Sequence, residues 1–330
     1  MTMQNAKTID VHAHAVFEET FGAAGVHGPE LSDSSEGQPV FRVGNYKLHG
    51  VRYRGSAFMD PDVRITAMDK AGIDFQVLSP NPLTYFHFID SESAAKFCRR
   101  HNDVLASMMR RYPDRLAGLA ALPMQSPGDA IQELKRSILE LGLWGAYVGT
   151  EFGLGLDAPA LDPLYSTFVE LNVPLFLHPA PSGIDGPRGV PAMDRYDLDL
   201  LIGFAAQETI AVGTLIYGGV LDRHPALDIC VSHGGGAIAL LSGRFAQAAR
   251  KRPWSKGSMR EPGAFEAQLR RLWFDNHLHG DAAEALLTAV VGRERLVLGT
   301  NFAGWDQPAG GGKFEVPSWL ADNARRLLRR

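Results

Sequence analysis

Eight short apolar segments, separated by segments with helical periodicity, constrain the fold of this 330-residue chain more than any other feature. The eight are TIDVHAH (8–14), IDFQVLS (73–79), LAGLAAL (116–122), LWGAYVG (143–149), VPLFLH (173–178), LDICVS (227–232), LWFDN (272–276) and RLVLGT (295–300). Nearly continuous apolar runs of this length are typical of parallel strands that are covered on both faces. Eight strand-then-helix units predict a closed (β/α)8 TIM-like barrel; an open doubly wound sheet is the alternative. Barrels of this kind often form one unit of this size, so we expect a single domain over residues 1–330.

Helix start and stop signals lie between the apolar runs. The segment 60–72 opens with Asp-Pro and ends with Gly, as a capped helix with proline in its first turn does. The segment 126–141 repeats this pattern with Ser126 as the expected N-cap, and Asp162 is expected to open another helix. These signals support the alternation of strands and helices.

Two segments interrupt that alternation. Residues 15–59 are Gly-rich and polar and follow the first run, and residues 179–199 follow the fifth. Both begin at the carboxyl ends of predicted strands, where barrel enzymes build their active sites. We therefore expect lid or substrate-binding loops in both segments.

Histidines gather at these strand ends. Residues two apart on a strand point to the same side, so His12 and His14 should aim together and could chelate a metal. A pair of surface histidines is the alternative. His178 ends the fifth run, His233 follows the sixth and Asn301 follows the eighth. Taken singly, His178 could bind a loop and His233 could cap a helix, but the set predicts one site at the barrel mouth.

Charge and composition exclude several classes of partner. The net charge is −4, and no block of Lys and Arg marks a nucleic-acid surface. The apolar runs are far shorter than the about 20 residues of a membrane span, and MTMQNAK at the start lacks the apolar core of a secretory signal. Cys98 and Cys230 lie within apolar patterns and are expected to be buried thiols, neither a disulfide nor a metal site. We therefore expect a cytoplasmic protein with no nucleic-acid or membrane partner.

Several stretches resemble one known family. They are IDVHAH, FMDPDVRITAMDKAGIDFQVLS, LAGLAALPMQSP, FLHP, ETIAVGTLIYGGVLDRHPALDICVSHGGGAIALLSGR and LVLGTN. Together they resemble the amidohydrolase-2 branch of the amidohydrolase superfamily, typified by aminocarboxymuconate-semialdehyde decarboxylase. The resemblance spans nearly the whole chain, and IDVHAH together with HGGGAIALLSGR is specific for this branch.

The resemblance implies one divalent metal ion per chain. By that resemblance His12, His14 and His178 are its ligands, and His233 is the catalytic acid or base beside it. Zinc is the usual metal of the family, and nitrogen ligands also suit manganese, iron and cobalt.

Two arginines match family positions. Arg244 resembles an arginine that reaches the site of a neighbouring subunit, which implies a homodimer or a hetero-oligomer with a related chain. Arg54 resembles one that holds a substrate carboxylate, with Arg52 as the alternative because the register there is loose. A solvated loop charge is the competing interpretation for each of them.

The chain departs from the family pattern at the end of the eighth run. The family has an aspartate there that binds the metal and accepts protons, and this chain has Asn301 in GTNFAGWD. An amide cannot act as a base and is a poor ligand. Three neutral imidazoles can still make a metal-bound water acidic, so proton handling would pass to His233. Asp306 could fold back to replace the carboxylate or could cap a loop, and metal binding could be lost or altered.

The seventh run ends in a second group of ionisable residues. Asp275, His277 and His279 could be partners of the metal ligands or ordinary loop residues, and the sequence leaves both open.

The resemblance implies, first, non-oxidative decarboxylation of an unsaturated or aromatic carboxylic acid, with a proton delivered to the carboxyl-bearing carbon. A metal-dependent hydratase or hydrolase that acts on a ring-cleavage-type acid is the second alternative, since fold and ligands do not distinguish these reactions. A third is a non-catalytic or partner-dependent subunit, retained for its fold after Asn301 replaced the aspartate.

Overall fold

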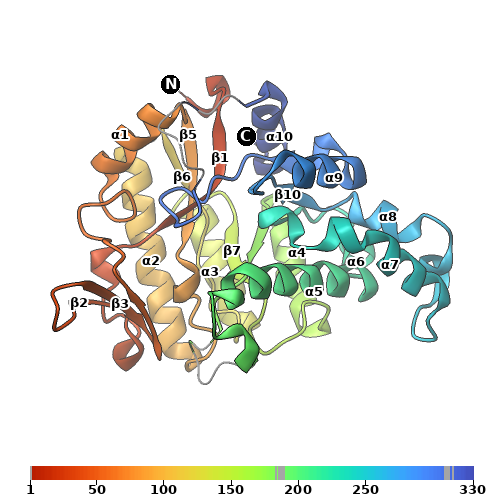
Figure 1. Ribbon diagram of the computed structural model, residues 1–330, viewed down its shortest axis with the longest axis horizontal. Helices are drawn as coiled ribbons and strands as arrows, with labels where there is room; N and C mark the ends of the chain where they lie inside the picture. The colour runs from red at the N-terminus through yellow and green to blue at the C-terminus, as the bar shows by residue number, and fades with distance from the viewer. Residues whose placement is uncertain (1, 183, 185–189, 308–312, 314–315) are drawn as a thin grey trace.

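Eight parallel strands form the centre of the molecule. The computed structural model describes residues 2–182, 184, 190–307, 313 and 316–330 (Figure 1). The strands are β1 (Ile9–Ala15), β5 (Phe75–Pro80), β6 (Leu116–Gly118), β7 (Ala146–Gly149), β8 (Leu175–His178), β9 (Ile229–Val231), β10 (Trp273–Asp275) and β11 (Leu296–Val297). Each of them overlaps one of the eight apolar runs.

The strands close into a barrel. They pair in the orders β1-β5-β6 and β11-β10-β9-β8-β7. A parallel bridge between Ala120 and Ala146 joins β6 to β7, and one between Asp10 and Leu298 joins β1 to β11. The predicted (β/α)8 barrel is confirmed, and the open doubly wound alternative is wrong.

Helices surround the barrel. They are α1 (Pro61–Ala71), α2 (Ser91–Arg111), α3 (Pro127–Leu139), α4 (Asp162–Leu171), α5 (Phe204–Tyr217), α6 (Val220–Arg223), α7 (Ile238–Lys251), α8 (Ala264–Leu269), α9 (Asp281–Val291) and α10 (Ser318–Leu328). Asp60 caps α1 as predicted, since its side chain accepts from the backbone N of Asp62 and Val63.

Two further helix starts lie where they were predicted. Ser126 occupies the N-cap position of α3, although its side chain makes no capping hydrogen bond. Asp162 is the first residue of α4, and its carboxylate accepts from Arg223 and His224.

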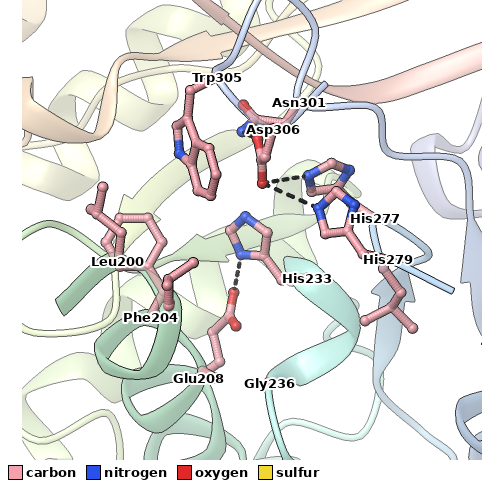
Figure 2. A pocket seen from close by; sticks show the side chains of 13 residues that line it. Leu200, Phe204, Glu208, His233, Gly236, His277, His279, Asn301, Trp305 and Asp306 are labelled. Atoms are coloured by element: carbon pink, nitrogen blue, oxygen red, sulfur yellow. Dashed lines mark hydrogen bonds and ion pairs between the residues drawn. The ribbon is translucent and has the colours of Figure 1, made fainter. Parts of the chain in front are cut away.

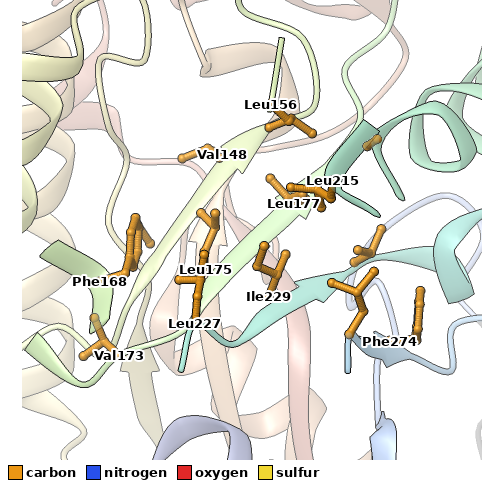
Figure 3. Packing of buried hydrophobic residues seen from close by; sticks show 14 of the residues in the cluster. Val148, Leu156, Phe168, Val173, Leu175, Leu177, Leu215, Leu227, Ile229 and Phe274 are labelled. Carbon is orange, nitrogen blue, oxygen red and sulfur yellow. The ribbon is translucent and has the colours of Figure 1, made fainter. Parts of the chain in front are cut away.

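Side chains alternate between two apolar layers along the strands. One set points into the barrel, with Val11, Val77 and Phe176 among its members, and residues of α10 such as Leu327 close its amino end. The other set points outward against the helices, and Figure 3 shows part of it around β7, β8 and β9. Because α10 closes the amino end of the barrel, the end left for a polar site is the one at the carboxyl ends of the strands.

The insertion after β1 forms its own small sheet. The antiparallel strands β2 (Glu30–Asp33), β3 (Pro39–Val43) and β4 (Tyr46–His49) lie at the end of the barrel away from α10 (Figure 1). The sheet packs through Phe41 and Val43 on a separate apolar cluster that includes Ile184. Asn45 N donates to Ile184 O over 3.0 Å, so the two predicted loop segments contact each other. Residues 183 and 185–189 of the second segment lie outside the described residues.

One helical stretch meets the composition of a membrane span. Among the described residues, Asp199–Tyr217 is long and apolar enough by that test, with a mean hydropathy of 1.5. It consists of a π-helical turn, Asp199–Gly203, followed by α5. Val212, Leu215 and Ile216 are buried in the outer apolar layer, whereas Leu201, Ile202 and Ile210 of the same stretch are exposed.

A buried polar network fixes the strand that carries His12. The Asp10 carboxylate accepts from His12 N at 3.0 Å, Thr300 Oγ1 at 2.7 Å and Gln76 Nε2 at 2.8 Å. Arg64 donates to Gln76 Oε1 at 2.8 Å and to His14 O at 2.6 Å. All of these side chains are buried, so the network ties β1 to α1, to β5 along one edge and to the residues after β11 along the other.

We expect Arg64→Met to lower the free energy of unfolding by about 3 kcal/mol, because it leaves Gln76 and the His14 carbonyl buried without their donor. Urea denaturation followed by circular dichroism measures this. Arg111→Met is the control: its ion pair with Asp62 is exposed and should contribute less than about 1 kcal/mol. Equal losses in the two variants would contradict a structural role for the buried network.

Candidate metal centre and active site

Three imidazoles from two strands converge inside the mouth of the barrel. His12 and His14 come from β1, where one extra residue between Asp10 and Ala13 forms a bulge against β5. His178 ends β8. The three residues are 0–4% exposed, and one ligand atom from each lies within 4.8 Å of the others. The structure thus brings together the three predicted metal ligands.

Each of these imidazoles has its Nδ1 hydrogen-bonded to an oxygen. His12 Nδ1 contacts Asp275 Oδ2 at 2.8 Å, His14 Nδ1 contacts Pro80 O at 3.1 Å, and His178 Nδ1 contacts Pro179 O at 2.6 Å. Since these oxygens accept, each Nδ1 carries the proton, and each Nε2 presents a lone pair.

The Nε2 atoms therefore face one another without a proton to share. His12 Nε2 and His14 Nε2 are 3.2 Å apart. His178 Nε2 is buried and has no hydrogen-bond partner among the described residues. Lone pairs at this distance repel, and a cation between them removes the repulsion. Ligand atoms about 2.1 Å from one ion lie about 3.0–3.4 Å apart, so the donor set fits a divalent metal.

Electrostatics keeps these ligands neutral. Burial lowers the pKa of His14 to about 3, and burial together with neighbouring imidazoles lowers the pKa values of His12 and His178 well below the usual range. Neutral imidazole is the form that binds a metal.

His233 lies beside this group with the opposite tendency. Its ring centre is 4.9 Å from that of His178 and 5.0 Å from that of His12. Its Nδ1 donates to Glu208 Oε1 over 2.7 Å. Burial lowers the pKa of His233, but the Glu208 carboxylate raises it by more than burial lowers it, and the resulting pKa is about 9. His233 is therefore suited to donate a proton.

Sequence reasoning missed Glu208. It lies on the apolar helix α5, is fully buried, and also accepts from Ser232 Oγ at 2.5 Å. A lone carboxylate within the apolar run FAAQETIAVGTLIY was the available signal.

A pocket opens in front of His233 (Figure 2). One wall is apolar and contains Leu200, Phe204 and Trp305. The opposite wall carries the polar side chains of His277, His279, Asn301 and Asp306. The pocket can thus hold a flat apolar molecule with polar groups on one edge.

Asn301 and Asp306 meet in that polar wall. Asn301 Nδ2 donates to Asp306 Oδ1 over 2.5 Å. Asp306 Oδ2 contacts His277 Nε2 at 3.0 Å and His279 Nε2 at 3.5 Å. Asp306 therefore folds back toward the mouth, where its carboxylate joins His277 and His279 in a separate group from the three metal ligands.

Neither predicted substrate arginine lines this pocket. Arg54 is exposed and pairs with Glu18 at 2.9 Å, and Arg52 beside it is exposed too. Arg244 is exposed on α7. Within one chain, no Lys or Arg is among the described residues of the pocket wall.

This combination of closed barrel, His-x-His pair and strand-end histidines matches a family model. Residues 9–330 match the model described as Amidohydrolase. The chain belongs to the amidohydrolase family. The family membership that the sequence motifs predicted is thus confirmed.

Several curated relatives of this amidohydrolase are decarboxylases, and another is the 2-keto-4-carboxy-3-hexenedioate hydratase of Sphingobium sp., 26% identical over 73% of this chain and 69% of that protein. The 2-amino-3-carboxymuconate-6-semialdehyde decarboxylase of Dictyostelium discoideum is 33% identical over 244 residues, which are 74% of this chain and 66% of that protein. The gamma-resorcylate decarboxylase of Rhodococcus jostii is 34% identical over 198 residues, 56% of this chain and 59% of that protein. The chain spans less than two thirds of the length of each of these two decarboxylases.

Solved structures share the fold of this amidohydrolase. The 5-carboxyvanillate decarboxylase of Novosphingobium aromaticivorans, complexed with manganese and 4-hydroxy-3-methoxy-5-nitrobenzoic acid, superposes with a TM-score of 0.78 at 21% identity and full coverage of both chains. At this identity the likeness establishes the fold alone.

We expect Asp275→Asn to weaken the affinity for the first equivalent of Zn²⁺ by about 10- to 100-fold, because the charge that holds His12 in its ligating tautomer is lost. Competition with a chromophoric chelator measures this affinity. Asp33→Asn, an exposed change on β2, is the control. An unchanged affinity in Asp275→Asn would contradict the role assigned to that carboxylate.

Proposed function

We propose that this amidohydrolase is a metal-dependent, non-oxidative decarboxylase of an aromatic carboxylic acid. The observation that carries the proposal is a neutral three-imidazole metal site directly beside His233, whose pKa is raised to about 9. A proton donor next to a cation suits protonation of a carbon that bears a carboxylate. The decarboxylase names of the relatives support the same choice.

His12, His14 and His178 would hold the metal. When bound, the metal supplies Lewis-acid chemistry for the carboxylate and a neighbouring hydroxyl. His233 donates its proton to the carboxyl-bearing carbon. The bond from that carbon to the carboxyl group then breaks, its electron pair restores the ring, and carbon dioxide leaves. Glu208 accepts from His233 Nδ1, and its charge keeps the ring in the imidazolium form, so that the proton on Nε2 is the one transferred.

The pocket favours an aromatic acid with a single carboxylate. Leu200, Phe204 and Trp305 offer an apolar surface for a ring. A second carboxylate would meet no Lys or Arg side chain among the described wall residues. Binding of a dicarboxylic acid would require Arg54 or Arg52 to leave its exposed position, or Arg244 to enter from a neighbouring copy.

Asn301 acts, in this proposal, through Asp306. Its amide holds Asp306 Oδ1 and replaces a carboxylate that would repel Asp306 at this distance. It is thus a positioning residue, and the acid–base role belongs to His233.

We propose zinc as the metal, because three nitrogen ligands suit it, with manganese, iron or cobalt as alternatives. We also propose a cytoplasmic enzyme that assembles as a homodimer or with a related chain. Buried free thiols at Cys98 and Cys230 support a reducing compartment, and exposed apolar side chains of Leu201, Ile202, Ile210 and Leu240 support assembly.

The proposal is tested by carbon dioxide release. We expect the zinc-loaded protein to release it from 2,6-dihydroxybenzoate or a related ortho-hydroxy aromatic acid without an added oxidant, and His233→Ala to lose about a hundredfold or more of this activity. Muconate-type acids are the comparison. Incorporation of water without carbon dioxide would instead support a hydratase or hydrolase, and turnover only after a partner chain is added would support a partner-dependent subunit.

We expect Glu208→Gln to move the alkaline limb of the kcat/KM profile to lower pH by about 1 unit or more. His233 must be protonated to act, activity falls as pH rises through its pKa, and the Glu208 carboxylate is the group that raises that pKa. Glu261→Gln, an exposed change, is the control. An alkaline limb at the same pH in Glu208→Gln would show that Glu208 does not raise the pKa of His233.

A further inference from the structure

A second group of possible metal ligands lies at the outer edge of the pocket. It consists of His277 and His279, which follow β10, and Asp306, which follows β11. One ligand atom from each lies within 4.8 Å of the others. Figure 2 shows both imidazoles turned toward the same Asp306 oxygen, above His233.

We propose that His277, His279 and Asp306 form a second binding site for a divalent transition-metal cation. It is distinct from the site formed by His12, His14 and His178, and it does not depend on which reaction the enzyme performs.

The distances fit a coordination sphere. Asp306 Oδ2 lies 3.0 Å from His277 Nε2 and 3.5 Å from His279 Nε2. Ligands about 2.0–2.2 Å from one ion are separated by about 2.9–3.5 Å, depending on its geometry. Two imidazoles and one carboxylate are also a donor set that zinc and iron(II) sites use.

The carboxylate is held ready for this role. Asn301 donates to Asp306 Oδ1, which leaves Oδ2 for the imidazoles. The Asp306 side chain is only 13% exposed, and His277 is buried. Of the two carboxylates that line the pocket, Glu208 is committed to His233, so Asp306 is the anionic ligand available to a cation.

This second site is open to the pocket, so a bound cation could also bind water or a substrate oxygen. The His279 side chain is 60% exposed, and all three residues line the pocket. Three protein ligands leave at least one position for water or a substrate oxygen. The ring of His277 is 5.6 Å from that of His12, so the two sites would share one pocket.

The competing explanation is a hydrogen-bonded clamp. In that case the two histidines only hold Asp306 and its loop against the barrel, and no metal binds between them. The two explanations differ in the number of metal ions that the protein binds.

The test is a Co²⁺ titration of the full chain after removal of metal with a chelator. Bound cobalt is counted by equilibrium dialysis, and its visible absorption reports the ligand set. We expect two equivalents in the parent protein, one in His279→Ala, one in His178→Ala and two in the control His49→Ala, an exposed change on β4. Asp306→Asn should also lose the second equivalent, and Asn301→Ala should weaken it by about 10- to 100-fold.

Thermal unfolding of each variant checks that it is folded. One equivalent in the parent protein that His178→Ala removes and His279→Ala retains would overturn the second site and leave a clamp only. Two equivalents in both His279→Ala and Asp306→Asn would overturn it as well. Binding of two equivalents without carbon dioxide release would instead count against the proposed decarboxylation and leave the second site standing.

Discussion

The arrangement of the site depends on two nitrogen lone pairs that face each other. His12 Nε2 and His14 Nε2 lie 3.2 Å apart, and hydrogen bonds from each Nδ1 prevent either ring from placing a proton between them. This repulsive contact exists because the surrounding structure imposes it. The bulge in β1 sets the spacing of the two histidines, and the buried Asp10 network fixes the backbone on both sides of His12. Such pre-organisation reduces the entropic cost of ordering the ligand side chains when a metal binds.

The three inner imidazoles have no carboxylate among them, and the nearby carboxylates lie around them. The inner ligands are neutral, and the carboxylates lie one step away: Asp275 behind His12, Glu208 behind His233, and Asp306 at the pocket edge. Asn301 makes this distribution stable, because its amide donates to Asp306 where an aspartate would repel it. The carboxylate in contact with Asn301 is thus Asp306, five residues later, which contacts His277 and His279 and belongs to a group separate from the three inner imidazoles.

Much of the barrel and of its inner site follows from local sequence rules. Apolar runs and glycine or proline boundaries predict the strands, and the two-residue period of a strand predicts the convergence of His12 and His14. For Glu208 the sequence offers one signal, a lone carboxylate within an apolar helical run, but only the tertiary structure shows that its partner is His233. The small sheet β2–β4 was not predicted either, since glycine and polar residues obscure the pattern of its strands. The role of Asp306 depends on the conformation of a loop, which spacing alone does not determine.

The composition of the helical stretch Asp199–Tyr217 follows from its position between the barrel and the pocket. Val212, Leu215 and Ile216 face the outer apolar layer, and Leu200 and Phe204 face the pocket. A helix that serves both surfaces needs apolar residues on two faces, which accounts for part of a hydropathy that length and composition alone would assign to a membrane. Leu201, Ile202 and Ile210 of the same stretch are exposed and raise its hydropathy further. Glu208 lies on this helix between the face that packs in the outer apolar layer and the face that lines the pocket. There Glu208 supplies one buried carboxylate, and His233 Nδ1 and Ser232 Oγ donate hydrogen bonds to its Oε1.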